Sequence, residues 1–336
     1  MGPNSQVYCW GSNADGQLGD GDLSDRALPH AVPGQLGVAV GAGSYHACAL
    51  QSDGATSCWG WNVAGQVGDG SNINRLSPFG VAKLPNAVGL AAGGYHTCSL
   101  AIDGSARCWG QNDLGQLGDG SQINSFDPMG VFSLPRSQAI AAAGRHSCAL
   151  ANDGTVQCWG GNENGELGDG STLSRALPAP VLNLSNVSAI AAGFHHSCAL
   201  NSDQSVSCFG SHEFGQLGNG TNQDSSVPVP VLGLPATVAL ATGYNHTCAL
   251  VVDSTVYCWG WNAAGQLGDG STLNRSTPVR VEGLGNVLAL AGGGFHSCAQ
   301  TRDGAYSCWG SNDSGQLGDG SFVDHPLPAP VAPFLN

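Results

Sequence analysis

The chain has 336 residues, of which only 10% are charged, and 24 Asp and Glu against 10 Lys and Arg give a net charge of -14. Such a negative chain repels phosphate backbones, so we expect no nucleic-acid partner. No apolar run approaches the roughly 18 residues that cross a bilayer, so we expect no membrane insertion. The first residues, Met1-Gly2-Pro3, lack the basic and apolar segments of a signal peptide, and we interpret them as the start of a mature sequence.

A Cys-Trp-Gly or Cys-Phe-Gly motif recurs along the chain and shows that it is built from repeats. The motif begins at Cys9, Cys58, Cys108, Cys158, Cys208, Cys258 and Cys308, with a spacing of 49 residues once and 50 residues five times. A period of this length is typical of proteins in which each unit buries its apolar face only against its neighbours. We therefore predict that residues 1–336 form a single domain of seven repeats.

One repeat, residues 87–136, contains four short segments with the pattern of β-strands. Residues 87–92 form an apolar run that glycines end, residues 95–102 alternate, residues 105–109 alternate after a turn, and residues 129–134 follow a proline. No long segment with helical periodicity is free of Gly and Pro. Four-stranded sheets that repeat in this way form a β-propeller, which protects strand edges by closing into a ring. The sequence therefore predicts an all-β, seven-bladed propeller.

The repeat also resembles a known family. The combination GxxHxCAL, then DG, then CWGxNxxGQLGDGS resembles the repeats of the regulator of chromosome condensation family, over nearly the whole chain. The resemblance implies a seven-bladed propeller and raises guanine-nucleotide exchange or chromatin docking as a function. This chain departs from the eukaryotic pattern because it carries Cys at both facing positions of each hairpin, which argues against a nuclear role.

One blade is expected to be incomplete. The CWG segment occurs seven times, but the preceding GxxHxC segment occurs only six times, at His46, His96, His146, His196, His246 and His296. We predict that the strand at residues 7–10 joins the tail at residues 326–335 in a reduced seventh blade, closed by the two termini. Cys9 then has no mate.

The remaining cysteines form six pairs, each ten residues apart. A three-residue hairpin loop at Ser52-Asp53-Gly54 would set residue 48 opposite residue 58 on adjacent strands. Directly opposed residues have Cα atoms about 4.5 to 5.5 Å apart, which a disulfide tolerates. We favour six cross-hairpin disulfides, which join Cys48 to Cys58, Cys98 to Cys108, Cys148 to Cys158, Cys198 to Cys208, Cys248 to Cys258 and Cys298 to Cys308.

Two alternatives to disulfides remain open. Free cysteines pack as small hydrophobic residues in tight β cores. Zinc needs four ligands, whereas one hairpin supplies only two cysteines with no obvious second pair within reach. The disulfide interpretation predicts an oxidising compartment, so we expect a secreted or extracytoplasmic protein. No CxxC motif points to redox catalysis.

Two repeated polar series are candidates for metal binding, and we interpret both as structural. A histidine at the same strand position in every unit should hydrogen-bond a backbone carbonyl of the neighbouring blade. The aspartates of the GDG segments suit turns, and one carboxylate per blade falls short of the six to eight oxygens that Ca²⁺ takes. We predict no metal and no cofactor, and bound calcium is the alternative for the aspartates.

Binding residues are expected where the repeats differ. The residue before each repeated His and the residue after each CWG segment vary freely, and they include aromatic residues and Arg at otherwise polar loop positions. This composition is typical of interface hot spots, and ordinary surface variation is the alternative. The candidate binding residues are Tyr45, Trp61, Tyr95, Arg145, His195, Asn245, Trp261 and Phe295.

These observations favour a monomeric, extracytoplasmic scaffold that binds another protein through its variable loops. We expect no enzyme activity, because the GxSxG, HExxH and Walker motifs are all absent. The two alternatives are an exchange-factor or chromatin-docking propeller and an enzyme with a polar pocket in the central channel.

Overall fold

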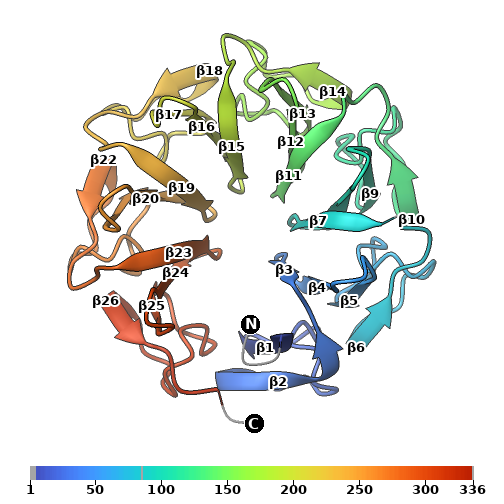
Figure 1. Cartoon of the computed structure of the whole chain (residues 1–336), viewed down its shortest axis with the longest axis horizontal. Helices are drawn as coiled ribbons and strands as arrows, with labels where there is room; N and C mark the ends of the chain where they lie inside the picture. Colours follow the sequence, from blue (N-terminus) through green and yellow to red (C-terminus); the bar gives the residue numbers. More distant parts are fainter. Residues whose placement is uncertain (1–4, 85, 335–336) are drawn as a thin grey trace.

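The computed structural model describes residues 5–84 and 86–334, which form a ring of antiparallel β-sheets (Figure 1). The described residues contain strands and no helix, and so none that could span a membrane. The predicted all-β propeller is confirmed. Figure 1 shows the innermost strand of each complete sheet pointing toward the centre of the ring and the outermost strand at its edge.

Six sheets have four strands each, paired in chain order from the centre outward. The first blade consists of β3 (Ala39–Ala42), β4 (His46–Leu50), β5 (Thr56–Gly60) and β6 (Arg75–Gly80). The second consists of β7 (Ala87–Ala92), β8 (His96–Ala101), β9 (Ala106–Gly110) and β10 (Ser125–Gly130). The third consists of β11 (Ser137–Ala143), β12 (His146–Ala151), β13 (Val156–Gly160) and β14 (Arg175–Pro180).

The other three blades repeat this arrangement. The fourth consists of β15 (Val187–Ala192), β16 (His196–Asn201), β17 (Val206–Gly210) and β18 (Ser225–Pro230). The fifth consists of β19 (Thr237–Thr242), β20 (His246–Val251), β21 (Val256–Gly260) and β22 (Arg275–Arg280). The sixth consists of β23 (Val287–Gly292), β24 (His296–Thr301), β25 (Tyr306–Gly310) and β26 (His325–Pro330).

The predicted count of seven blades, one of them reduced, is wrong, because the structure has six four-stranded blades and one separate two-stranded sheet. In that sheet β1 (Gln6–Gly11) pairs with β2 (Arg26–Leu36). The predicted pairing of residues 7–10 with the tail at 326–335 is also wrong, since β26 is the outer strand of the sixth blade and pairs with β25. The reason is local: the loop after each CWG strand always returns the chain as that strand's own outer neighbour. Leu335 lies outside the described residues.

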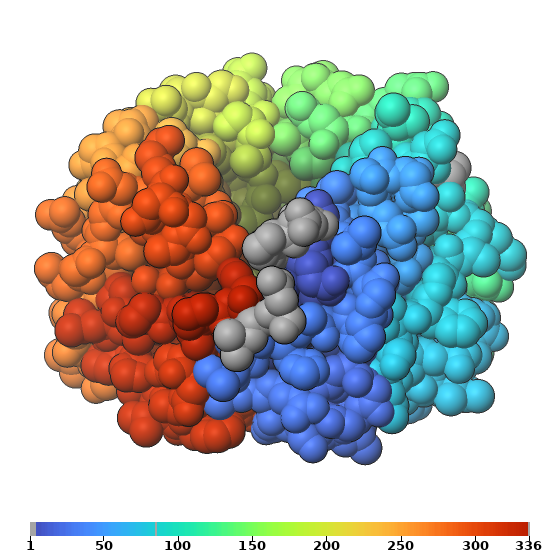
Figure 2. All heavy atoms as spheres, turned by 60° about the horizontal axis from the view of Figure 1, so that its bottom comes forward, coloured from blue at the N-terminus to red at the C-terminus, as the bar shows by residue number. Residues whose placement is uncertain are grey.

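The ring is nevertheless closed by contacts between the two ends of the chain. The Trp10 indole nitrogen donates a hydrogen bond to the carbonyl of Gln316, at 3.0 Å, and the Phe334 ring lies 4.9 Å from the Tyr8 ring. Figure 2 shows the first strands, in blue, beside the sixth blade, in red, on the side where the ring closes. The tail therefore contributes an aromatic contact to the closure instead of a paired strand.

All six predicted disulfides are present. In every complete blade the two cysteines are direct partners on adjacent strands, as Cys48 and Cys58 are, with Cα atoms 4.0 to 4.1 Å apart. Five of the six bridges lie in apolar cores between blades: Cys98 and Cys108, for example, pack with Leu117 and with Trp159 of the next blade. The alternatives of free thiols and zinc are thereby excluded for these twelve cysteines.

Cys9 is the free cysteine of the described residues. It packs beside Val7, Val32 and Trp59. Burial, together with the negative charge of Asp20, raises the pKa of its thiol to about 12. A thiol with such a pKa stays protonated and reacts slowly at neutral pH.

Complete reduction should increase the mass of the protein by about 12 Da, because each of the six disulfides takes up about two hydrogens. Mass spectrometry before and after reduction under denaturing conditions measures this change. Alkylation without reductant should label a single thiol, and the Cys9→Ala variant should take up no label. An unchanged mass would show that the cysteines are not bridged.

Candidate functional site

A relay of hydrogen bonds holds each blade to the next beneath the inner turns of the ring. Five of the repeated histidines contact a hydroxyl of the following blade through Nε2: His46 with Thr97, His96 with Ser147, His146 with Ser197, His196 with Thr247 and His246 with Ser297, at 2.8 to 2.9 Å. Each hydroxyl then donates to a carbonyl of the first blade, as Thr97 does to Gln66 at 2.8 Å. The predicted carbonyl partner in the neighbouring blade is therefore wrong: the histidine contacts a hydroxyl of that blade, and the carbonyl bonded by the hydroxyl lies in the histidine's own blade. Because the hydroxyl donates its hydrogen to this carbonyl, the histidine donates from Nε2.

The sequence contains a signal for this relay, a Ser or Thr after the repeated His, whose role becomes clear only when neighbouring blades are seen together. The residue after each repeated His is Thr97, Ser147, Ser197, Thr247 or Ser297, but it is Ala47 in the first blade. Ala47 packs against the two-stranded sheet, which lacks the GxxHxC segment and so has no histidine equivalent to those of the complete blades. Conversely, His296 of the sixth blade has no hydroxyl partner among the described residues.

The histidines are buried and uncharged. Burial lowers the pKa of His46, His146 and His296 to about 4, and that of His96, His196 and His246 to about 3. Among the described residues, no group of three or more His, Cys, Asp or Glu side chains is arranged to hold a metal ion. The repeated histidines therefore act as neutral ties between blades.

The histidine rings also explain the glycine three residues before them. A Cβ atom on Gly43 would lie 2.4 Å from Cε1 of the His46 ring, and Gly93, Gly193, Gly243 and Gly293 show the same conflict in four other blades. Glycine leaves room for the ring at these five positions. The third blade has Ala143 at this position, so glycine is the packing preference of the turn in five of the six complete blades.

The aspartates of the GDG segments are tied into their own loops. Asp69 accepts hydrogen bonds from Asn62 at 3.1 Å and Arg75 at 2.6 Å, and Asn62 accepts one from the Val67 amide. Burial opposes ionisation of Asp69, but hydrogen bonds from Ser71 and Arg75 outweigh it and lower the pKa of the carboxyl. The interpretation of these residues as loop ties agrees with these contacts.

The two variable series lie side by side at one end of the ring. In every complete blade, the amide of the residue after CWG donates to the carbonyl of the residue before the repeated His. Trp61 donates in this way to Tyr45 and Trp261 to Asn245, both at 2.8 Å. In the other four blades the same bond joins Gln111 to Tyr95, Gly161 to Arg145, Ser211 to His195 and Ser311 to Phe295. The structure thus gathers the candidate residues on one face.

On this face the aromatic residues form two clusters. Tyr45, Trp61 and Tyr95 lie with ring centroids 5.6 to 6.2 Å apart. The second cluster is a chain of rings in which Trp261 contacts Phe295, Phe295 contacts Tyr244, Tyr244 contacts Phe194 and Phe194 contacts His195, at 4.6 to 5.1 Å. We call the seven aromatic residues of these clusters the aromatic collar: Tyr45, Trp61, Tyr95, Phe194, Tyr244, Trp261 and Phe295.

Sequence reasoning missed Phe194 and Tyr244. They stand two residues before the repeated His, where the other blades have Ser44, Gly94, Gly144 and Gly294. This third variable position was available in the alignment of the repeats. The contact of the two residues across blades depends on the closed ring, which the repeats alone do not display.

The remaining candidate residues, Arg145, His195 and Asn245, differ in the contacts that they make near the collar. Arg145 forms an ion pair with Asp113 of the preceding blade. His195 Nδ1 lies 3.8 Å from Oε1 of the buried Glu166. Burial opposes ionisation of Glu166, but hydrogen bonding with His195 and nearby charge lower the pKa of its carboxyl. Asn245 belongs to the face through its backbone and makes none of these ring contacts.

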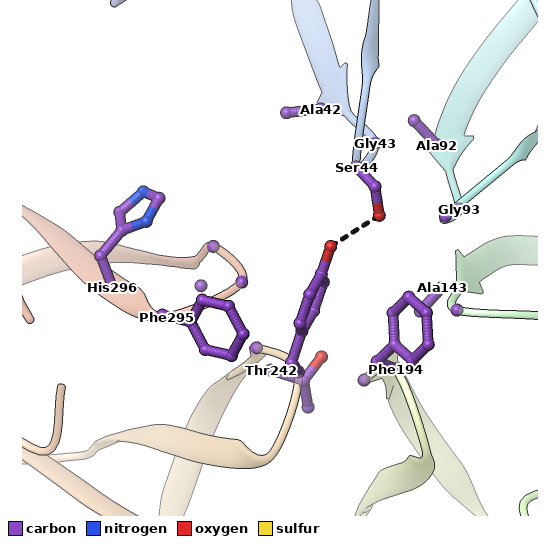
Figure 3. A pocket seen from close by; sticks show the side chains of 18 of the residues that line it. Ala42, Gly43, Ser44, Ala92, Gly93, Ala143, Phe194, Thr242, Phe295 and His296 are labelled. Carbon is purple, nitrogen blue, oxygen red and sulfur yellow. Dashed lines mark hydrogen bonds between the residues drawn. The ribbon is translucent and has the colours of Figure 1, made fainter. Parts of the chain in front are cut away.

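A pocket opens at the centre of the collar, with a volume of about 640 Å³. Its wall consists of Gly and Ala from the inner strands of the six complete blades, together with aromatic and hydroxyl side chains. The hydroxyls of Tyr244 and Ser44, both in the pocket wall, are 2.7 Å apart, and the dashed line at Ser44 in Figure 3 marks this hydrogen bond. Burial, followed by the neighbouring phenols of Tyr45 and Tyr244, raises the pKa of Tyr95, which agrees with phenols that converge on this mouth.

Comparison with protein families gives a single assignment for this architecture. The model of the RCC1-like domain matches residues 6–335. The chain belongs to the RCC1-like domain family. Curated protein sequences gave no match.

Solved structures of the RCC1-like type share the fold. Yeast RCC1 (Prp20), solved in complex with Kap60, has a TM-score of 0.88 and 23% identity over 98% of this chain and 84% of that chain. Prp20p from Saccharomyces cerevisiae, studied for binding to Gsp1p and histones, has a TM-score of 0.86 and 24% identity over 98% and 86%. Human WBSCR16 has a TM-score of 0.86 and 20% identity over 97% and 94%. These identities establish a common fold.

The buried histidines predict that the protein loses stability in mild acid. Histidine in an unfolded chain has a pKa near 6.5, whereas burial holds the native values at about 3 to 4, so the unfolded state binds more protons between these limits. The free energy of unfolding should therefore be highest above about pH 6.5 and fall as the pH drops toward 4. Denaturant titrations across this range measure the slope.

Replacing one buried histidine should flatten that slope by about one proton, or about 1.4 kcal/mol per pH unit. We predict this change for His146→Gln, and no change for His30→Gln, because His30 is exposed on β2. Equal slopes for both variants and the wild type would show that the buried histidines do not control acid stability.

The Thr97→Val variant should lose about 1 to 3 kcal/mol of unfolding free energy, because it leaves the buried His46 donor and one hydrogen bond to the Gln66 carbonyl unsatisfied. Thr277→Val, at an exposed position of β22, is the control and should change stability by less than about 0.5 kcal/mol. Equal losses in both variants would remove the relay as a determinant of stability.

Proposed function

We propose that this RCC1-like propeller is an extracytoplasmic scaffold that binds another protein through the aromatic collar. In this proposal residues 1–336 act as a single monomeric domain, without a cofactor, a nucleic-acid partner or enzyme activity. The contacting residues are Tyr45, Trp61, Tyr95, Arg145, His195, Asn245, Trp261 and Phe295, to which the structure adds Phe194 and Tyr244.

The gathering of aromatic side chains on one face is the observation that carries the proposal. Tyr45 and Phe295 are each 40% exposed, and each also contacts other rings of the collar. Aromatic residues and Arg dominate the binding energy of protein interfaces. The relay beneath the face holds the turns that carry them, so little order has to be gained on binding.

The disulfides support the extracytoplasmic location. Six bridges occur in one chain of 336 residues, one in each complete blade. Structural disulfides form and persist in oxidising compartments and are rare in the cytosol and nucleus. A nuclear exchange factor would not retain them, which favours the scaffold over the nucleotide-exchange alternative.

Two further observations bear on the alternatives. Kap60, Gsp1p and histones are named with the yeast structures, so proteins are the partners named for those relatives. The central pocket is lined mainly by Gly, Ala, hydroxyl, amide and aromatic groups, and its described lining includes no Asp, Glu, Lys or Arg. His296 also lines it, but burial lowers the pKa of this histidine to about 4, far from the near-neutral value that suits a general acid or base, so such a wall supports binding better than acid-base catalysis.

The function is tested by affinity capture from the extracellular fraction of the organism that encodes the protein, followed by titration with the purified partner. We expect a partner whose affinity falls at least about 10-fold for the Trp61→Ala and Trp261→Ala double variant, because aromatic hot spots contribute over 1 kcal/mol each. Leu273→Ala with Phe322→Ala, at exposed loop positions away from the collar, is the matched control.

Thermal unfolding must show that both double variants remain folded. Equal binding by both would remove the collar from the interface. A wild-type protein that retains no protein partner at all would contradict the function itself.

A further inference from the structure

We infer that the collar accepts a positively charged side chain, Lys or Arg, carried by an extended segment of the partner. This inference rests on the proposed function and specifies the chemistry of the partner. It follows from the arrangement of charges around the collar, from the groups that line the pocket and from an ion pair that already exists at one blade.

Carboxylates surround the collar. The third residue after each CWG or CFG segment is exposed in all seven repeats. Four of these seven residues are acidic and none is basic. We call the four the acidic rim: Asp113, Glu163, Glu213 and Asp313. The uncharged members of the series are Ala14, Val63 and Ala263.

Three members of the acidic rim are available to a partner. Asp113 is paired with Arg145. Glu163, Glu213 and Asp313 make no ion pair among residues 5–84 and 86–334. Exposed carboxylates without an ionic partner, on a chain with a net charge of -14, produce a negative potential that attracts cations.

Arg145 shows how a cation is held on this face. Its guanidinium pairs with the rim residue Asp113, and its positive charge also reaches the phenol of the collar residue Tyr95. The residues that correspond to Arg145 in the next two blades are His195 and Asn245, and those that correspond to Asp113 are Glu163 and Glu213. Neither Glu163 nor Glu213 has an Arg opposite it. A cation from another protein can therefore form with either glutamate the ion pair that Arg145 forms with Asp113.

The collar supplies the second half of the site. The faces of aromatic rings attract Lys and Arg, most strongly where water is excluded. Phe194, Tyr244 and Phe295 all line the pocket, whose described lining carries no fixed positive charge, and the only histidine in it, His296, has a pKa that burial lowers to about 4. Figure 3 shows the rings of Phe194 and Phe295 at the same opening, and the Tyr244 ring contacts both of them, at 4.6 and 4.9 Å.

Competing cations on this face are already engaged. Arg145 is neutralised by Asp113, and His195 lies beside the carboxylate of Glu166. An anionic ligand would therefore find no free positive group at the collar, whereas a cationic ligand meets both carboxylates and ring faces. Charge complementarity thus selects a basic segment over an acidic one.

The test compares two probes that differ in charge alone. One is a peptide of alternating Gly and Arg, and the other carries citrulline, which has nearly the same shape but no charge, in place of every Arg. Binding is measured by calorimetry and by tryptophan fluorescence, since Trp61 and Trp261 lie in the collar. We expect the Arg peptide to bind at least about 10-fold more tightly than the citrulline peptide.

Matched variants separate the rim from general charge effects. Glu163→Gln with Glu213→Gln should weaken binding of the Arg peptide about 3- to 10-fold at low salt, and by less at high salt. Asp153→Asn with Asp203→Asn removes the same charge from hairpin tips at the opposite end of the inner strands and should leave binding unchanged. Phe295→Leu should weaken binding about 2- to 10-fold, and Phe322→Leu should not.

Equal binding of the Arg and citrulline peptides would overturn the inference and would point to an uncharged ligand instead. Equal effects of the rim and hairpin variants would overturn it as well. If the captured partner depends on Trp61 and Trp261 but neither competes with the Arg peptide nor responds to the rim variants, this inference fails while the proposed function stands.

Discussion

The architecture depends on one hydrogen-bonding node that recurs between blades. The carbonyl of Gln66 accepts a bond from the Trp109 indole at 2.9 Å and another from the Thr97 hydroxyl at 2.8 Å, and that hydroxyl in turn binds His46. Two lone pairs of one buried carbonyl are thus used, and both donors belong to the following blade. A buried polar group is costly unless it is paired, so each blade is held in a single position relative to its neighbour.

The node explains why so many residues repeat. The Trp of CWG, the Gln of GQLGDG, the His of GxxH and the following Ser or Thr all belong to it. Where one member changes, the network changes with it: Phe209 stands in place of Trp, and the Glu166 carbonyl keeps only the bond from Ser197. In the same repeat His212 and Asn219 replace the usual Asn and Asp and hydrogen-bond each other at 2.7 Å.

Residues outside the node are free to vary, and the turns place them together. The node lies directly beneath the turn before each histidine, so the residues of that turn project onto one face from a rigid base. Because the side chains beneath are buried and hold adjacent blades through the Nε2, hydroxyl and indole bonds, variation in the turn changes the surface without changing the ring. The aromatic collar and the acidic rim are therefore a variable surface carried by an invariant frame.

The incomplete seventh unit gives the ring its one irregular joint. Trp10 and Gln316 keep the indole bond that other blades have, but the histidine relay is absent on both sides, at Ala47 and at His296. The disulfide is also absent there, and Cys9 remains a buried thiol. The packing of Phe334 against Tyr8 and Trp10 stands in place of the missing strands.

The sequence by itself determined the repeat, the all-β class, the hairpin register and the six disulfides, because these depend on contacts within about ten residues of one another. The spacing of Cys48 and Cys58 around Gly54 fixes which residues face each other, whatever the rest of the chain does. The sequence also identified which positions vary, and so most of the candidate residues.

Only the tertiary structure decided how the ends meet, what the histidines bind and how the collar is assembled. β1 pairs with β2 because the chain returns locally, a choice that a count of motifs does not resolve. His46 and Thr97 are 51 residues apart, and Ser44 and Tyr244 are 200 residues apart. Such contacts form only when the ring closes. Closure depends on the packing angles between all the blades, and no single repeat determines it.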